Sequence, residues 1–328
     1  MKKAFITGAS GQDSSYLAEH LLSMGYEVHG MIRRNSVSEN QHPRIEYLNG
    51  KIELYYGDLT DQTSIESILT KVRPDEIYNI GAQSHVGISF QVPQFTAQTN
   101  AIGVLNMLEA YKRLCPSAKF YQASSSEMFG LSVEDDNFQR ESTVMNPTSP
   151  YGCAKVFAYN MVRHYRRAYN LHAVNGILFN HESPRRGSNF VTNKVVKTAC
   201  QIKLGIKDQL ELGNMDSHRD WGHSKDYVKA MHLIMNHDIA DDFVVSTMQT
   251  HSVREMCDVV FTLLGMNYED YVVQNAKFMR AEELPYLKGD STKIRETLGW
   301  EPTYTFIEMM NEMVEHWMDV LQGKESLR

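Results

Sequence analysis

A tyrosine and a lysine four residues apart, Tyr151 and Lys155, open a stretch that is predicted to be helical. Residues four apart share one face of a helix, so the lysine ammonium can lie beside the phenol. A nearby positive charge favours the phenolate, which makes the pair a candidate base toward an alcohol. The same spacing also occurs in exposed helical pairs, so the assignment depends on what surrounds it.

Three hydroxyl groups and a carboxylate precede this pair. The strand-like stretch KFYQAS ends at Ser124, and Ser125, Ser126 and Glu127 follow it. Parallel α/β sheets bind ligands at the carboxyl ends of their strands. The serines alone are also typical of a turn, and Glu127 of a solvated position. Together with the tyrosine–lysine pair they favour an active site.

The stretch FITGASGQDSSYLAEHLL, residues 5–22, resembles a turn that binds the phosphates of a dinucleotide. Gly8 and Gly11 allow the bend and the close approach of a pyrophosphate, and the amides that open the next helix offer an anion site. Ser14 stands where a third glycine is usual, so we expect that helix to lie slightly farther out. The candidate cofactor contacts here are Gly8, Ser10, Gly11, Gln12 and Asp13.

The next two predicted strands end in residues that indicate which dinucleotide binds. Arg33, Arg34, Asn35 and Ser36 stand where an acidic residue would mark NAD, and two guanidinium groups there suit the 2′-phosphate of NADP. In YGDL, Asp58 can accept a hydrogen bond from an adenine amino group, with Leu59 beside it.

Strand-like and helix-like stretches alternate through the first half of the chain. Strands separated by helices predict parallel pairing, hence an α/β fold with a doubly wound sheet. We expect residues 1–179 to form the cofactor-binding domain, with 222–247 returning to its sheet. Residues 180–221 and 248–328 are expected to form a smaller α/β domain for the substrate. The methionines at 309, 310, 313 and 318 in the last predicted helix are interpreted as core residues.

Composition excludes several classes of protein. The 328 residues carry a formal net charge of −7, which argues against nucleic acid as the main partner. The four cysteines lie far apart and are expected to be reduced thiols, and no histidine has a second ligand at metal-site spacing, so we predict no metal. With no apolar run of membrane length and no expected signal segment, the prediction is a cytoplasmic protein.

Several longer stretches resemble the GDP-mannose 4,6-dehydratase family, within the extended short-chain dehydrogenase/reductase superfamily. The matching stretches are ITGASGQDSSYLAEHLL, GYEVHGMIRR, YGDLTD, PDEIYNIGAQSHV, YQASSSEMFG, SPYGCAK, NGILFNHESPRRG, LGNMDSHRDWGHSKDYV and LGW. They span nearly the whole chain, and FNHESPRRG and RDWGH are specific to the family. The resemblance implies a Rossmann domain, a smaller nucleotide-sugar domain and tightly held NADP.

The implied reaction turns GDP-mannose into GDP-4-keto-6-deoxymannose with no net change in NADP. The resemblance makes Tyr151 the base toward the C4 hydroxyl, with Lys155 beside it and Ser125 bonding to the sugar O4. Glu127 removes the C5 proton and delivers it to the departing C6 hydroxyl, helped by Ser126. The family usually has threonine at position 125, and the serine retains the hydroxyl.

The resemblance also assigns residues farther along the chain. Ile80, Gly81, Ala82 and Ser84 are expected to line the cofactor, and His181 and Arg186 to hold it. Residues assigned to the sugar and the diphosphate are Ser84, Ser125, Asn180, Lys194 and Arg219, and Arg280 and Glu283 are expected to close over the nucleotide. An exposed loop arginine is the alternative for Arg280.

Three other functions remain open at this point. An NADP-dependent reductase or epimerase of nucleotide sugars needs the tyrosine and lysine but not Glu127, and a dehydratase that holds NADPH can also reduce its own 4-keto product. A protein that only senses NADP needs none of the three residues. The family implies a homodimer or homotetramer, and the long segment from Asn35 to Gly50 is expected to reach a neighbouring subunit.

Overall fold

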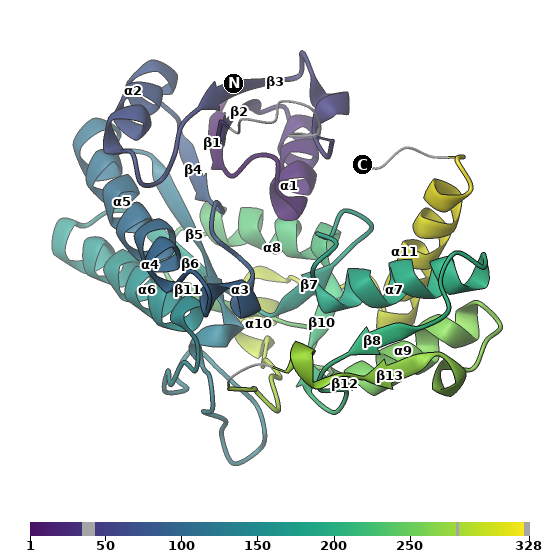
Figure 1. Ribbon diagram of the computed structural model, residues 1–328. Helices are drawn as coiled ribbons and strands as arrows, with labels where there is room; N and C mark the ends of the chain where they lie inside the picture. The colour runs from purple at the N-terminus through teal and green to yellow at the C-terminus, as the bar shows by residue number, and fades with distance from the viewer. Residues whose placement is uncertain (35–42, 280–281, 325–328) are drawn as a thin grey trace.

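Seven parallel strands form the central sheet of the protein, in the order β11-β6-β5-β4-β1-β2-β3 (Figure 1). The computed structural model describes residues 1–34, 43–279 and 282–324. The strands of the sheet are β1 (Lys3–Thr7), β2 (Glu27–Ile32), β3 (Ile52–Tyr56), β4 (Glu76–Asn79), β5 (Lys119–Ser125), β6 (Ala173–Leu178) and β11 (Asp242–Val245). The order reverses between β1 and β4, as in a doubly wound fold. The predicted α/β class with a parallel Rossmann-type sheet is confirmed.

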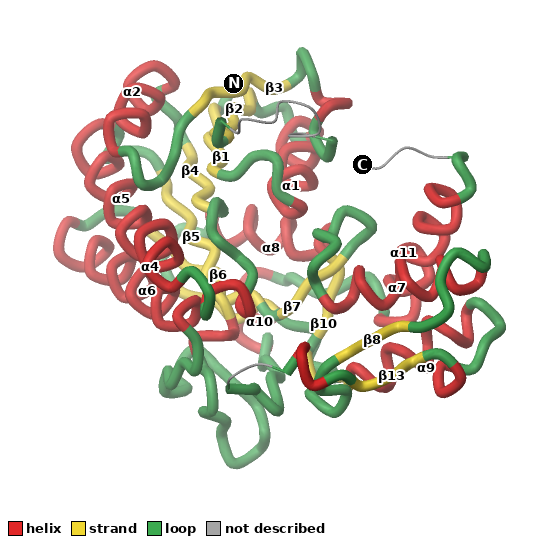
Figure 2. The backbone as a smooth tube through the Cα atoms, viewed as in Figure 1, coloured by secondary structure: helices red, strands yellow, loops and turns green. Residues whose placement is uncertain are grey.

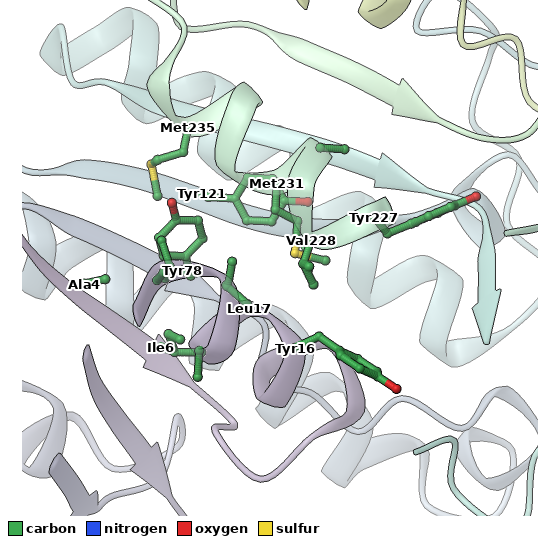
Figure 3. Packing of buried hydrophobic residues seen from close by; sticks show 14 of the residues in the cluster. Ala4, Ile6, Tyr16, Leu17, Tyr78, Tyr121, Tyr227, Val228, Met231 and Met235 are labelled. Carbon is green, nitrogen blue, oxygen red and sulfur yellow. The ribbon is translucent and has the colours of Figure 1, made fainter. Parts of the chain in front are cut away.

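Helices cover both faces of this sheet (Figure 2). One face carries α1 (Gln12–Ser23) and α8 (Ser224–Asn236), and the other carries α2 (Gln62–Val72), α5 (Gly103–Leu114) and α6 (Pro150–Tyr169). Figure 3 shows the first interface, where Leu17 of α1 and Met231 of α8 pack with Tyr78 and Tyr121 of the sheet. Burial of both faces explains apolar runs such as AFI in β1 and FVV in β11.

The helical stretch that precedes β5 is built from three consecutive segments. It begins as α4 (Pro93–Ala97), continues through a π-helical turn (Gln98–Ile102) and ends as α5. The short helix α3 (Val86–Ser89) precedes it, and single 3₁₀ turns occur at Glu46–Leu48 and Ser126–Met128.

A second layer with its own core stands beside the sheet. Its helices α7 (Val191–Lys203), α9 (Val253–Leu263) and α11 (Phe306–Leu321) pack together, and α10 (Thr292–Leu298) packs near β11. Met309, Met310 and Met313 are fully buried there and Met318 is partly buried, so their interpretation as core residues is confirmed. None of the helices in the described part of the chain combines the length and the apolar composition that a membrane span requires.

Three two-stranded sheets that the sequence did not predict join this layer to the rest. They pair β7 (Asn180–Glu182) with β10 (Trp221–His223), β8 (Leu210–Leu212) with β13 (Val272–Gln274), and β9 (His218–Arg219) with β12 (His251–Ser252). Strands of two or three residues are too short to show an alternating pattern.

The first glycine of the phosphate-type turn is required by its surroundings. Gly8 has φ = +66°, and a Cβ atom there would lie 2.7 Å from the Cα of Gly81. Gly25 also has a positive φ, of +80°, but nothing lies within 4 Å of the corresponding Cβ position. Substitutions at the two glycines can therefore separate the cost of a strained backbone from the cost of a steric clash.

We predict that Gly8→Ala destabilises the protein more than Gly25→Ala. The left-handed conformation alone costs a residue with a Cβ about 1–2 kcal/mol, which is the loss expected for Gly25→Ala in urea unfolding. Gly8→Ala adds the clash with Gly81 and should cost at least about 1 kcal/mol more. Equal losses for the two variants would show that the turn tolerates the extra atom.

Candidate active site

The carboxyl ends of the central strands open into a cavity of about 590 Å³. Its walls come from the segments after β4 and β5, from α6 and α7, and from the segment that follows β13. All five predicted catalytic residues line it: Ser125, Ser126, Glu127, Tyr151 and Lys155. The structure thus brings together residues that are up to 30 positions apart in sequence.

The start of α6 holds Tyr151 and Lys155 in place. Ser149 caps the helix by accepting a hydrogen bond from the amide of Gly152 at 3.0 Å, and Pro150 takes the first turn, where no amide partner is needed. Both functional side chains are buried, and the Lys155 ammonium lies 5.7 Å from the centre of the Tyr151 ring. The predicted pairing on one helix face is therefore present.

Burial dominates the ionisation of this pair. It raises the pKa of Tyr151 to about 12, although a hydrogen bond with Ser125 acts in the opposite direction. Burial also lowers the pKa of Lys155 to about 8. The lysine ammonium donates to the carbonyl oxygen of Ala123 at 2.7 Å rather than to the phenol. The cation that was expected to favour phenolate is thus bonded to the backbone.

Ser125 and Glu127 sit at the end of β5. The amide of Glu127 donates to Ser125 Oγ at 3.2 Å, which closes the short 3₁₀ turn over Ser126–Met128. Only 8% of the Glu127 surface is exposed, and the carboxylate contributes to the charge around Tyr151. The Tyr151 phenol and the Glu127 carboxylate therefore line the same cavity, and both residues are buried.

The turn between β1 and α1 has the features of a phosphate site. The amide of Gly11 donates to the carbonyl of Gly8 at 2.9 Å, and α1 starts at Gln12 without any side-chain cap. Uncapped amides at a helix start bind anions, so the turn fits a dinucleotide pyrophosphate. Ser10 lies in the same turn, and the Ser14 side chain is fully buried just behind it.

Asp13 reaches across from this turn to His181 of β7. His181 Nε2 lies 2.9 Å from Asp13 Oδ2, and Nδ1 lies 2.7 Å from the carbonyl of Phe179. Both ring nitrogens face acceptors, an arrangement that favours the doubly protonated ring. Burial opposes this charge, but Asp13 outweighs it and raises the pKa of His181; burial likewise opposes ionisation of Asp13, yet His181 lowers its pKa.

Gln12 strengthens the same connection. Its amide donates to the carbonyl of His181 at 3.2 Å and accepts from the hydroxyl of Ser183 at 2.8 Å. The predicted cofactor turn is therefore tied to the segment that holds His181.

Arg33, Arg34 and Asp58 line a second hollow of about 390 Å³, together with Tyr56, Gly57, Asp61 and Ser64. The Arg34 guanidinium lies 5.7 Å from the centre of the Tyr56 ring, and one Asp58 oxygen accepts from the hydroxyl and the amide of Thr60. The two arginines offer guanidinium groups of the kind that bind phosphate oxygens, in a hollow that Asp58 and Asp61 also line.

The segment after β4 has two different roles. Ile80, Ala82 and Ser84 line the main cavity, whereas Gly81 forms the close contact with Gly8. Leu59 is buried against Gly103 and Gly81 and lines neither hollow.

The residues assigned to the substrate gather on the opposite wall. Of these, Asn180, Lys194, Arg219 and Glu283 line the main cavity together with Arg186, which is expected to hold the cofactor. Burial lowers the pKa of Lys194, whose ammonium donates to the Glu211 carbonyl at 2.6 Å. Arg219 is 7% exposed and donates to the Leu284 carbonyl at 2.9 Å.

Among the residues of the cavity wall that sequence reasoning missed, three make distinctive contacts. Glu182 is 1% exposed and pairs with Arg186 at 2.9 Å, and it lies inside the quoted FNHESPRRG stretch. His85, from the GAQSHV stretch, is held by the Asn189 carbonyl at 3.1 Å. Phe278 places its ring 3.6 Å from the Lys194 ammonium, and nothing in its sequence surroundings indicates this role.

Three predicted site residues, Asn35, Ser36 and Arg280, lie outside the described residues. Within the described ranges, no group of three or more His, Cys, Asp or Glu side chains is arranged to hold a metal ion.

Comparison with known proteins places this geometry in a family. The sequence model described as GDP-mannose 4,6 dehydratase matches residues 5–313. The GDP-mannose 4,6 dehydratase of Homo sapiens is 45% identical over 346 aligned positions, covering 97% of this chain and 92% of the human protein.

Solved structures share the fold. The dTDP-glucose 4,6-dehydratase DesIV of Streptomyces venezuelae, solved with NAD bound, has a TM-score of 0.85 and 21% identity over 99% of this chain and 100% of its own. RMD of Pseudomonas aeruginosa, complexed with NADPH, has a TM-score of 0.80 and 21% identity over 97% of this chain and 100% of its own. With the family match over nearly its whole length, the chain belongs to the GDP-mannose 4,6-dehydratase family.

Proposed function

We propose that this protein converts GDP-mannose to GDP-4-keto-6-deoxymannose, as a hydro-lyase. The observation that carries the proposal is the shared cavity in which the Tyr151–Lys155 pair and Glu127 meet, in a chain of this family. A nucleotide-sugar reductase or epimerase needs the pair but no acid for elimination. The buried carboxylate therefore favours the dehydratase.

NADP is the proposed cofactor. Structural neighbours carry NAD or NADPH, and the uncapped start of α1 fits a pyrophosphate. The choice of NADP is supported by Arg33 and Arg34 in the second hollow, since guanidinium groups match phosphate oxygens. When bound, NADP supplies an acceptor that takes a hydride from C4 and returns it to C6. His181 and Arg186 are proposed to hold it from the β7 side.

The two parts of the chain are proposed to bind different ligands. We assign residues 1–179, with 222–247, to the cofactor, and residues 180–221 and 248–328 to the nucleotide sugar. Lys194 and Arg219 supply positive charge for the diphosphate, and Asn180 and Ser84 supply polar contacts for the sugar. Glu283 lies on the same wall, and we propose that it closes over the nucleotide together with Arg280.

Tyr151 acts first in the proposed mechanism, by taking the proton of the C4 hydroxyl. Ser125 hydrogen-bonds to the sugar O4 and to the phenol, so one hydroxyl aligns donor and base. Burial raises the pKa of Tyr151 to about 12, so the phenolate depends on positive charge brought into the cavity. With a pKa of about 8, Lys155 is mostly protonated at pH 7 and supplies part of that charge.

Glu127 acts second. The C4 ketone acidifies the C5 proton, which the carboxylate removes and then delivers to the departing C6 hydroxyl. Ser126 is next to it in the 3₁₀ turn and assists this transfer. The low exposure of the site keeps bulk water from competing for the proton.

We further propose a cytoplasmic homodimer or homotetramer. All four cysteines are free thiols, as suits a reducing compartment. Large apolar side chains are exposed on neighbouring segments, with 42% of Phe95, 40% of Ile102 and 39% of Phe157 accessible. Such a patch on α4, the π-helical turn and α6 supports a subunit interface. The segment from Asn35 to Gly50, predicted to reach a neighbour, lies partly outside the described residues.

Replacement of Glu127 should separate the two proton transfers. Glu127→Gln keeps size and polarity but removes the base, so overall turnover should fall by about 10²–10⁴. In a single turnover, absorbance of reduced nicotinamide should still appear, while exchange of the C5 hydrogen in deuterated water should stop. Tyr151→Phe should abolish both signals. Glu269→Gln, at an exposed acid that does not line the cavity, is the matched control and should change neither.

The dehydratase proposal loses its main support if Glu127→Gln eliminates water at the parent rate. It is also contradicted if the parent protein yields a C4 epimer instead of the 4-keto sugar.

Replacing Arg33 and Arg34 together by glutamine should weaken NADP but not NAD. A hydrogen bond to a charged group contributes about 1.5–3 kcal/mol, so calorimetric titration should give an NADP Kd at least ~10-fold higher. Arg167→Gln, an exposed arginine of α6, serves as the control for lost charge. Equal losses for NADP and NAD would exclude a 2′-phosphate site.

The proposed interface is tested by light scattering at micromolar concentration. The parent should have the mass of a dimer or tetramer, and Phe157→Glu should lower it because a carboxylate then replaces an exposed ring in the apolar patch. Ile239→Glu, at a residue 70% exposed elsewhere, should leave the mass unchanged. A fully active monomer would refute the proposal.

A further inference from the structure

Five buried polar side chains form a straight row across the central sheet. Backbone register aligns Thr7 of β1 with Asn79 of β4, Asn79 with Gln122 of β5, Gln122 with Asn175 of β6, and Asn175 with Asp242 of β11. Their exposed fractions run from 0% to 4%. A doubly wound sheet normally buries apolar side chains at such positions, so the row needs an explanation.

One half of the row is a directed chain of hydrogen bonds. The amides of Ile80 and Gly81 donate to Thr7 Oγ1 at 3.0 and 2.9 Å, so the hydroxyl proton goes to Asn79 Oδ1, at 2.7 Å. Asn79 Nδ2 then faces Gln122 Oε1 at 2.8 Å. Because Thr7 Oγ1 already accepts two hydrogen bonds, its proton must go to Asn79. This fixes the orientation of the side-chain amides of Asn79 and Gln122.

The chain ends at the carbonyl that holds the lysine of the active site. Gln122 Nε2 donates to the oxygen of Ala123 at 3.0 Å, and Lys155 Nζ donates to the same oxygen at 2.7 Å. A lysine side chain has four flexible carbons and three donors, so its position depends on fixed acceptors. The Ala123 carbonyl is such an acceptor, and Gln122 is bonded to it from the row.

The other half of the row leads away from the lysine. Asn175 accepts from Ser124 Oγ at 3.1 Å and donates to Asp242 Oδ1 at 2.8 Å. Among the described residues, no side-chain hydrogen bond joins Gln122 to Asn175. Both halves of the row are buried, but only the half that contains Gln122 reaches Lys155. Asn175, in the other half, therefore serves as an internal control for Gln122.

We propose that Gln122 is a positioning residue for Lys155, which through the Ala123 carbonyl fixes the ammonium beside Tyr151 and links it to the phosphate turn. The inference rests on the proposed function, since it concerns the lysine as the partner of the catalytic tyrosine. The link to the turn runs through Thr7, the residue before Gly8, and through the amide of Gly81, which Gly8 touches. Ordering of that turn and placement of the lysine are thereby connected.

The test compares Gln122→Met with Asn175→Leu, in which apolar side chains of similar size replace the two amides. In single turnovers with NADP and GDP-mannose, the pH dependence of reduced nicotinamide formation reports the tyrosine–lysine pair. A displaced ammonium stabilises the phenolate less. Gln122→Met should therefore move the rising limb of the curve of rate against pH about one pH unit toward alkaline pH. That shift corresponds to a rate about tenfold lower at neutral pH, with recovery at high pH. Asn175→Leu should lower stability comparably but leave the limb in place.

Two further measurements check this result independently. Gln122→Asn keeps an amide that is too short to span from Asn79 to the Ala123 carbonyl, and it should give the same shift. Without substrate, the pH dependence of Lys155 acylation, read by mass spectrometry, should show that the lysine pKa rises from about 8 in Gln122→Met, because a released ammonium is better hydrated. The other charged groups around the pair, Glu127, Asp13 and Arg186, are unchanged in every variant.

An unshifted limb in Gln122→Met, or an equal shift in Asn175→Leu, would overturn the inference. If the parent forms no reduced nicotinamide from GDP-mannose, the proposed function fails, and the labelling of Lys155 still decides the inference. An unchanged lysine pKa in that experiment would then refute it.

Discussion

Parallel pairing of β1, β4, β5 and β6 is the constraint on which the site depends. Parallel neighbours end at the same edge, so residues that follow Thr7, Asn79, Ser125 and Leu178 must meet there. The helices between the strands act as spacers that make this pairing possible. The phosphate turn and the carboxylate of Glu127, in the turn that follows β5, therefore share one edge although more than a hundred residues separate them.

Charge is buried at this edge in compensated pairs. Two carboxylates at this edge lie where water is scarce, and each has a cation beside it. Asp13 pairs with His181, and Glu182 pairs with Arg186. Lys155 is different, because its ammonium donates to a neutral carbonyl oxygen, that of Ala123. Burial lowers the pKa of this ammonium to about 8.

Local signals predicted the elements well where the chain carries caps and long apolar patterns. Such signals mark the bounds of α6, since Ser149 and Pro150 start this helix and Asn170 ends it in a left-handed turn. The small sheets escaped prediction because strands of two or three residues have no readable period. Clustering of Ser125, Glu127 and Tyr151 was predictable from motifs. The contact of Phe278 with Lys194, and the carbonyl partner of Lys155, depend on tertiary packing that spacing does not encode.

Strand β11 has a consequence for how the chain folds as it is made. It pairs with β6, yet about 60 residues separate the two strands in sequence. At typical rates of about 5–20 residues per second, a ribosome needs roughly 3–12 s to add that segment. During this time the nascent chain presents β6 as an open edge, with Asn175 lacking its Asp242 partner. Synthesis of this protein therefore includes an interval in which an apolar strand edge is exposed to association with other chains.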